Sequence, residues 1–283
     1  MILLTTKYII ITFIVAFYIA THVICNIEHE DAELLPMRHE KDNPHKVVNY
    51  LIPGMLRVPR KALEPFANEM VGDVVFVDLN SKVWDSKHFA EQIVNDIREG
   101  GYKDVRIFAI SIGDKVARQL DSEVGHELRK SGIKITTYDI NPCANRGEVK
   151  GGFRLGLVLG APLFRLITFA LGPIGYLDII PGDQGSVSDP NRHSLVEISS
   201  QLWAIAFEDT GKFKKSRDNI VLSRDDARLD NDKIVADAGG SARDGGLPGH
   251  IVMISGGHAD VIGYKVSYLD ALNDLGAFDD DYD

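Results

Sequence analysis

The chain has few of the residues that build disulfide-linked, zinc-binding or nucleic-acid-binding proteins. Its 283 residues include 2 cysteines, Cys25 and Cys143. Cys25 lies in an apolar N-terminal run, so the rest of the chain can form neither a disulfide framework nor a cysteine-based zinc site. Cys143 follows Asn141-Pro142 and is typical of a loop thiol rather than a nucleophile. Lys and Arg number 31 against 41 Asp and Glu, for a net charge of −10. Nucleic acid is therefore not expected as the main partner, because phosphate binding requires clustered basic side chains.

One long apolar run lies near the N-terminus. Residues 8–25 contain no Lys, Arg, Asp or Glu, whereas Lys7 precedes the run and Glu28 and Glu30 follow it. At about 1.5 Å per residue such a helix spans about 27 Å, close to the hydrocarbon thickness of a bilayer. We expect residues 1–25 to be a transmembrane signal-anchor with the domain on the extracytoplasmic side. A cleaved signal peptide, which would leave the protein secreted, is the alternative.

The remainder alternates between strand-like and helix-like segments. Residues 26–44 are polar and non-periodic, which favours a linker. Strand patterns are found at 47–52, 74–79, 105–110, 133–140, 219–222 and 250–255, and helical patterns at 62–71, 86–99, 113–131 and 261–275. Ser86 is the expected N-cap of the second of these helices. The alternation predicts an α/β fold over residues 45–276, with an open, mostly parallel sheet and helices on both faces. Residues 277–283 form an acidic tail.

Residues 148–210 interrupt this alternation. They include a long apolar stretch, 153–180, that contains Pro162, Pro173 and Arg165. A second transmembrane helix is one interpretation, but an arginine near the bilayer centre costs about 2.5–3.5 kcal/mol. We therefore expect an inserted cap over an active site, completed by a helix at 194–207.

A candidate nucleophile follows the strand 105–110. Ser111 lies between that strand and the helix 113–131, with Ala109 two residues before it and Gly113 two residues after it. A serine on a tight strand-to-helix turn requires small residues at both of these positions. The start of the following helix favours an oxyanion through its amide groups and its dipole. A Ser-x-Gly triplet outside this context would be an ordinary loop.

A serine nucleophile needs a base and an acid. His258 lies just after the strand 250–255 and before the final helix, whereas its competitor, His250, opens that strand at the end remote from the site. Asp226 follows the strand 219–222, and Asp225 is the substitute for it. The predicted triad is Ser111, His258 and Asp226, although surface charge is a sufficient explanation for any single acid in this loop.

The oxyanion needs two backbone donors. The strand 47–52 ends at Pro53-Gly54, and glycine lets the main chain turn toward the nucleophile. We expect the N–H groups of Met55 and Ile112 to form the pair. A simple Pro-Gly turn is the alternative reading of this loop.

The serine turn, the order Ser111, Asp226, His258, the Pro-Gly loop and the cap-sized insertion resemble the α/β-hydrolase superfamily. The resemblance implies hydrolysis of an acyl ester through an acyl-enzyme, in the manner of esterases and lipases, with a small-molecule or lipid-like substrate and no cofactor. The sequence departs from the usual pattern at Ala109, Asp114 and Pro53. Asp114 would oppose negative charge on an oxyanion unless it caps the helix and points away.

Two other classes of function stay open at this stage. The departures also suit a catalytically silent binding or interaction protein at the membrane that kept the fold. The glycines at 239–246 are the only basis for a nucleotide-binding protein, and they do not join a strand to a helix, which favours a loop.

Overall fold

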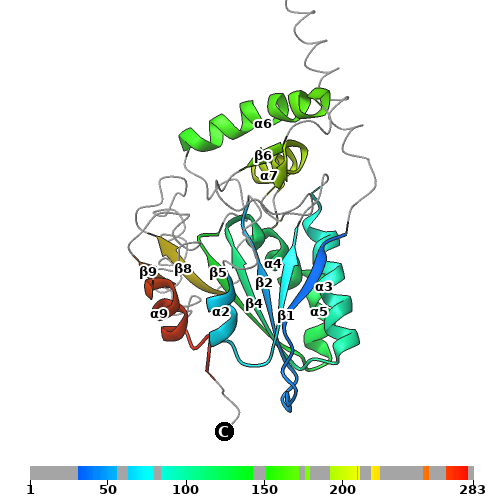
Figure 1. The fold of residues 1–283 in the computed structure, drawn as a ribbon, viewed down its shortest axis with the longest axis vertical. Coiled ribbons are helices and arrows are strands. Elements are labelled where there is room, and N and C mark those ends of the chain that lie inside the picture. Colours follow the sequence, from blue (N-terminus) through cyan, green and yellow to red (C-terminus); the bar gives the residue numbers. More distant parts are fainter. Residues whose placement is uncertain are drawn as a thin grey trace, which may run out of the picture.

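The computed structural model describes residues 31–55, 63–79, 84–142, 151–171, 176–178, 192–208, 210, 218–223, 251–254 and 266–279. A seven-stranded sheet with the order β1-β3-β2-β4-β5-β8-β9 organises them (Figure 1). Its strands are β1 (Glu33–Arg38), β2 (Val47–Ile52), β3 (Asp73–Asp78), β4 (Asp104–Ile110), β5 (Lys134–Ile140), β8 (Asp218–Ser223) and β9 (Ile251–Ile254). Only β1 pairs antiparallel, with β3, and all other pairs in this sheet are parallel. The predicted open, mostly parallel sheet is confirmed.

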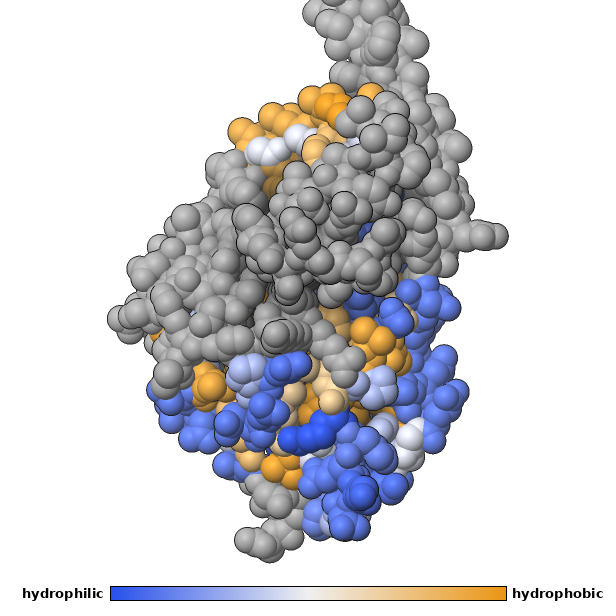
Figure 2. Space-filling model, viewed as in Figure 1, coloured by the Kyte–Doolittle hydropathy of each residue, from blue (hydrophilic) through white to orange (hydrophobic). Residues whose placement is uncertain are grey.

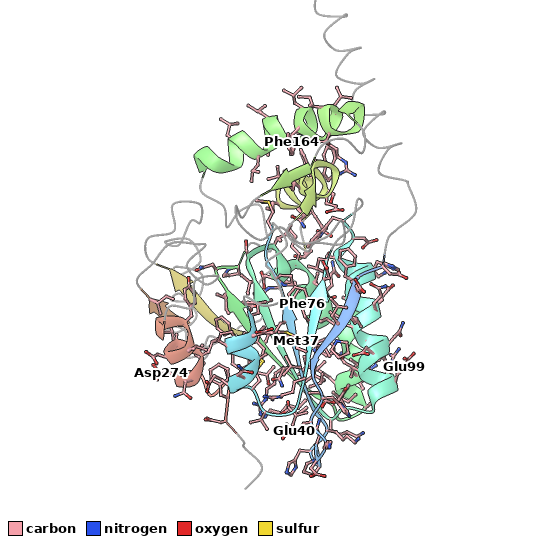
Figure 3. All side chains as sticks on the ribbon, viewed as in Figure 1. Met37, Glu40, Phe76, Glu99, Phe164 and Asp274 are labelled. Carbon is pink, nitrogen blue, oxygen red and sulfur yellow. The ribbon has the colours of Figure 1, made fainter. Side chains whose placement is uncertain are left out.

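Helices cover both faces of this sheet. They are α2 (Glu64–Glu69), α3 (Ser86–Gly100), α4 (Asp114–Asp121), α5 (Glu123–Lys130) and α9 (Val266–Asp274). Successive side chains of a strand point to opposite faces. On β4, Val105 and Ile107 therefore join the core under α3, α4 and α5, whereas Phe108 and Ile110 join the core with α2 and α9. Side chains fill the space between the sheet and the helices in Figure 3. Burial of both faces explains the continuous apolar pattern of β2, β3 and β4.

Part of the segment expected to be a linker is a strand. Within residues 26–44, β1 adds to the edge of the sheet beside β3. Leu34 packs against one core, and Leu35 and Met37 pack against the other. Pro36 lies within β1, where an edge strand tolerates the missing N–H. The linker expectation was wrong here because this short segment lacks a clean alternation of apolar and polar residues.

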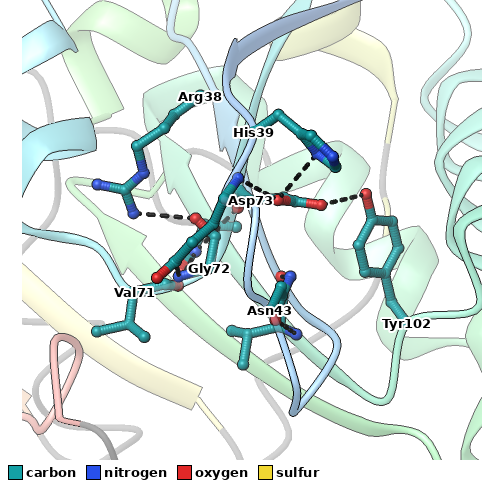
Figure 4. Close-up of polar contacts among 10 residues, drawn as sticks. Arg38, His39, Asn43, Val71, Gly72, Asp73 and Tyr102 are labelled. Carbon is teal, nitrogen blue, oxygen red and sulfur yellow. Dashed lines mark hydrogen bonds and ion pairs between the residues drawn. The ribbon is translucent and has the colours of Figure 1, made fainter.

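Hydrogen bonds to Asp73 fasten that edge of the sheet (Figure 4). One Asp73 carboxylate oxygen accepts the backbone N–H of Glu40 at 2.9 Å and lies 3.2 Å from His39 Nδ1. The other oxygen accepts the Tyr102 hydroxyl at 2.9 Å. Arg38 donates to the backbone carbonyls of Ala67 and Gly72 at 3.1 and 2.9 Å. This cluster stands where β3 begins, so it supports the fold from the end of the sheet opposite to Ser111.

Two helices differ in detail from the pattern-based expectation. The single helix expected at 113–131 divides at Ser122, and a Cβ on Gly125 would overlap the carbonyl oxygen of Leu120. The N-cap of α3 is Asp85, whose carboxylate accepts the backbone N–H groups of Lys87 and His88. Ser86 was the wrong cap, because its hydroxyl donates to Glu208 instead.

The segment between β5 and β8 forms the expected cap. It contributes α6 (Gly151–Leu171), the short paired strands β6 (Tyr176–Asp178) and β7 (Arg192–Ser194), and α7 (Leu195–Phe207). In Figure 1, α6 and α7 lie beyond the carboxyl ends of the central strands. Arg165 of α6 is buried and donates to the hydroxyl of Ser199 in α7 at 3.4 Å. Among the helices of the described ranges, α6 included, none is both long and apolar enough to cross a membrane. The expected anchor at residues 1–25 lies outside the described residues.

Candidate active site

Ser111 occupies a strained turn. β4 ends at Ile110, a 3-10 turn covers Ser111–Gly113, and α4 begins at Asp114. Ser111 has a φ of +54°, a value that few residues other than glycine adopt. Such strain persists only where the surrounding structure holds it, and it is concentrated at functional sites. The strand, turn and helix expected around Ser111 are all present, and the helix begins at Asp114, one residue later than expected.

Two glycines bring the loop after β2 against this turn. A Cβ on Gly113 would lie 2.7 Å from the carbonyl oxygens of both Ile52 and Pro53, closer than real contacts allow. A Cβ on Gly54 would lie 3.2 Å from Cβ of Ser111. The two turns therefore pack backbone to backbone, as neighbouring parallel strands permit at their carboxyl ends. Only glycine at 113 accommodates this approach.

The two expected oxyanion donors come from these adjoining turns. Ile112 is buried beside Leu157 and Ala161 of α6, and Met55 packs against the same cluster. No side chain caps the first turn of α4, whose N-cap is Gly113. The structure thus brings residues 52–54 against residues 111–113, and the assignment of the Met55 and Ile112 N–H groups as oxyanion donors stays a prediction.

The Asp114 side chain pairs with Arg118 and does not cap the N-terminus of α4. Its carboxylate accepts Nε of Arg118 at 3.1 Å, and Arg118 also donates to Asp139 of β5 at 3.1 Å. All three residues are at most 4% exposed. Capping of α4 by Asp114, which was one of the two possibilities considered from the sequence, does not occur, because an arginine one turn along the helix offers a charged donor. This partner offsets the negative charge that Asp114 places near the serine. The i,i+4 spacing of Asp114 and Arg118 was a sequence signal for their ion pair. No sequence signal indicated that Arg118 would also contact Asp139.

A second buried contact joins the site to the cap. Lys115 follows Asp114 and is fully buried, and its Nζ donates to the backbone carbonyl of Glu208, just after α7, at 2.5 Å. The Glu208 carboxylate accepts Nε1 of Trp84 at 2.9 Å and the hydroxyl of Ser86 at 2.5 Å. Burial raises the pKa of Glu208 above its usual range, against the opposing effect of the Lys115 charge. Sequence reasoning missed this contact, which joins positions far apart in the chain.

The other two members of the expected triad lie outside the described residues. These are His258 and Asp226, together with the alternatives His250 and Asp225. The strands before Asp226 and His258 are described: β8 ends at Ser223 and β9 at Ile254. Both strands run in the same direction as β4, because the pairs β4–β5, β5–β8 and β8–β9 are all parallel. The chain therefore leaves β8 and β9 at the same end of the sheet as Ser111. Within the described ranges, no group of three His, Cys, Asp or Glu residues is placed to hold a metal ion.

Solved structures share this architecture. No protein-family model and no curated protein sequence matches the chain. The type II thioesterase BorB from the borrelidin biosynthetic cluster superposes with a TM-score of 0.54 at 16% identity, over 86% of this chain and 96% of BorB. The α/β hydrolase MGS-M2 from a deep-sea metagenome library gives 0.55 at 14%, over 87% and 94%. MenH from S. aureus gives 0.53 at 16%, over 88% and 100%. The chain has the α/β-hydrolase fold, so the resemblance drawn from its sequence is confirmed for the fold.

Proposed function

We propose that this protein is a serine hydrolase that cleaves an acyl ester. The observation that carries the proposal is Ser111, a buried serine with positive φ between β4 and α4. That turn is the position from which a nucleophilic hydroxyl reaches the carboxyl edge of the sheet. Fold alone does not fix function, but a thioesterase is among the structures that share this fold.

In this mechanism Ser111 Oγ attacks the ester carbonyl while His258 accepts its proton. Asp226, or Asp225 in its place, orients His258 and stabilises its charged form. The N–H groups of Met55 and Ile112 stabilise the tetrahedral oxyanion. His258 then protonates the leaving alcohol, and water, deprotonated by the same histidine, releases the acid from the acyl-enzyme.

The cap favours an apolar acyl group. Ile112 of the serine turn is buried with Leu157 and Ala161 from α6 and with Ala204 and Ile205 from α7. An acyl chain that approaches Ser111 from beneath the cap therefore meets aliphatic side chains. This surrounding supports a lipid-like ester as substrate. The apolar run at residues 8–25 separately supports a membrane anchor with the domain on the extracytoplasmic side.

Labelling with a fluorophosphonate probe tests the nucleophile. The wild-type chain should be labelled, and Ser111→Ala should not. Ser131→Ala is the matched control, because Ser131 is an exposed serine at the end of α5, and it should be labelled like the wild type. Equal labelling of wild type and Ser111→Ala would remove the assignment of Ser111. A folded wild-type chain that resists the probe would favour the silent binding protein.

The partners of Ser111 are tested separately. His258→Gln should abolish labelling while leaving thermal unfolding unchanged. Asp226→Asn and Asp225→Asn should differ, and only the variant that removes the true acid should lose ester hydrolysis by several orders of magnitude in kcat. If neither aspartate variant loses activity, the acid comes from another position.

A further inference from the structure

An aliphatic stripe covers the outer face of α6. We name it the α6 stripe; its exposed fractions are 60% at Leu155, 68% at Leu159, 56% at Leu163, 37% at Leu166 and 44% at Ile167. At 100° per residue these positions fall within an arc of about 120°, on one side of the helix. Figure 2 shows the resulting hydrophobic surface over α6. Soluble monomers seldom leave a continuous apolar patch of this kind without a use for it.

The inner face of the same helix is fully engaged. Leu157, Ala161, Arg165 and Thr168 are all buried. Thr168 and Arg165 both contact the hydroxyl of Ser199 on α7. Because Arg165 points inward, the α6 stripe has no charged side chain of its own. The outer apolar face is therefore not a requirement of cap packing.

From these observations we infer that the α6 stripe inserts into the surface of a lipid bilayer. Its composition favours lipid over protein, since protein interfaces concentrate binding energy in Trp, Tyr and Arg and use Leu less. Its area does too. The five side chains expose roughly 500 Å² together, so two copies packed through this face would bury about 1,000 Å², less than a stable interface requires. A helix that lies in the plane of the bilayer interface buries an apolar face of this kind at the boundary between headgroups and acyl chains.

Docking in this way would place the bilayer close to the serine turn. Leu157 and Ala161 of the inner face pack with Ile112, so only the thickness of α6, about 10 Å, separates the turn from the docked surface. The inference concerns the surface of the cap and does not depend on hydrolysis by Ser111.

Fluorescence quenching by labelled lipid tests this inference in the full chain. In a Cys25→Ser, Cys143→Ser background, Leu159→Cys would carry an environment-sensitive fluorophore. The matched control carries it at Glu99→Cys, because Glu99 is exposed on α3 and lies far from α6 in Figure 3. Each protein is mixed with phosphatidylcholine vesicles that contain doxyl-labelled phosphatidylcholine. We expect several-fold stronger quenching at 159 than at 99, and the same result at Leu163→Cys.

Three results would overturn the inference. Absence of quenching at position 159, whether or not the chain binds the vesicles, would show that the α6 stripe does not contact lipid. Cross-linking between 159 positions of two copies without lipid would assign the stripe to a dimer. If the fluorophore at position 159 of the monomer is shielded from water in the absence of vesicles, another segment of the chain covers the α6 stripe. Leu159 is mostly exposed, so its replacement by cysteine leaves the core intact.

Discussion

Gly113 leaves no room for a side chain, and replacing it by alanine tests the packing of the serine turn. The φ of Gly113 is −57°, so alanine adopts this backbone conformation without strain. The added methyl, however, would lie 2.7 Å from two carbonyl oxygens, those of Ile52 and Pro53, and backbone cannot swing aside as a flexible side chain does. Overpacking of this kind costs about 1–3 kcal/mol. For a chain of this size, a loss of that magnitude lowers Tm by roughly 2–12 °C.

The same substitution should slow labelling of Ser111. To admit the methyl, the loop of Pro53 and Gly54 must move away from the serine turn, which separates the two expected oxyanion donors. Removal of one such donor costs about 2.7–4 kcal/mol in the transition state. Thermal unfolding and the rate of fluorophosphonate labelling measure the two effects.

Gly160→Ala is the control for this experiment. A Cβ on Gly160 of α6 would have nothing within 4 Å, so the change should be neutral or stabilise the protein by up to about 1 kcal/mol. If Gly113→Ala unfolds and labels like the wild type, the two turns are not in close contact, and this packing does not position the Met55 and Ile112 N–H groups.

Three further substitutions probe the supports of the site and the sheet. Arg118→Met should lower the free energy of unfolding in urea by about 3–5 kcal/mol, since it removes the arginine that both buried carboxylates contact. Adding Asp114→Asn and Asp139→Asn should restore much of the loss. Burial raises the pKa of Glu208 above 4.5, so the folded state binds the proton more tightly than the unfolded state. The contribution of Glu208 to the free energy of unfolding should therefore fall as pH rises from 4.5 through the raised pKa. Glu208→Gln should remove that pH dependence from urea unfolding measured across this range, and an unchanged profile would contradict the burial. Tyr102→Phe should cost about 0.5–1.5 kcal/mol by losing its hydrogen bond to Asp73, and a loss near zero would show that this bond contributes nothing.

The central strands were predictable from local pattern. The apolar run at 47–52 has the same bounds as β2, and the runs at 105–110 and 133–140 differ from β4 and β5 by one residue at the start. A strand buried on both faces needs a continuous apolar run, and that requirement is met within the strand itself. The alternation of such strands with amphipathic helices then limits the sheet to a mostly parallel order.

The edge of the sheet and the helix break were not predictable in this way. β1 contains Pro36 and lacks a clean apolar pattern, and it becomes a strand because β3 offers it an unpaired edge. The break at Ser122 depends on the approach of Gly125 to the Leu120 carbonyl. The pairing of β1 with β3 joins segments distant in the chain, whereas the contact of Gly125 with Leu120 is local but is not visible in the apolar periodicity.

The sequence by itself determined the order of the elements, the α/β class and the position of Ser111 between a strand and a helix. Only the tertiary structure decided that Ser111 has a positive φ, that Gly113 touches the loop after β2, and that Lys115 binds the backbone of Glu208. The physical reason is that apolar periodicity is a property of neighbouring residues. Backbone strain and buried charge pairs, in contrast, are stable only when segments distant in the chain are packed around them.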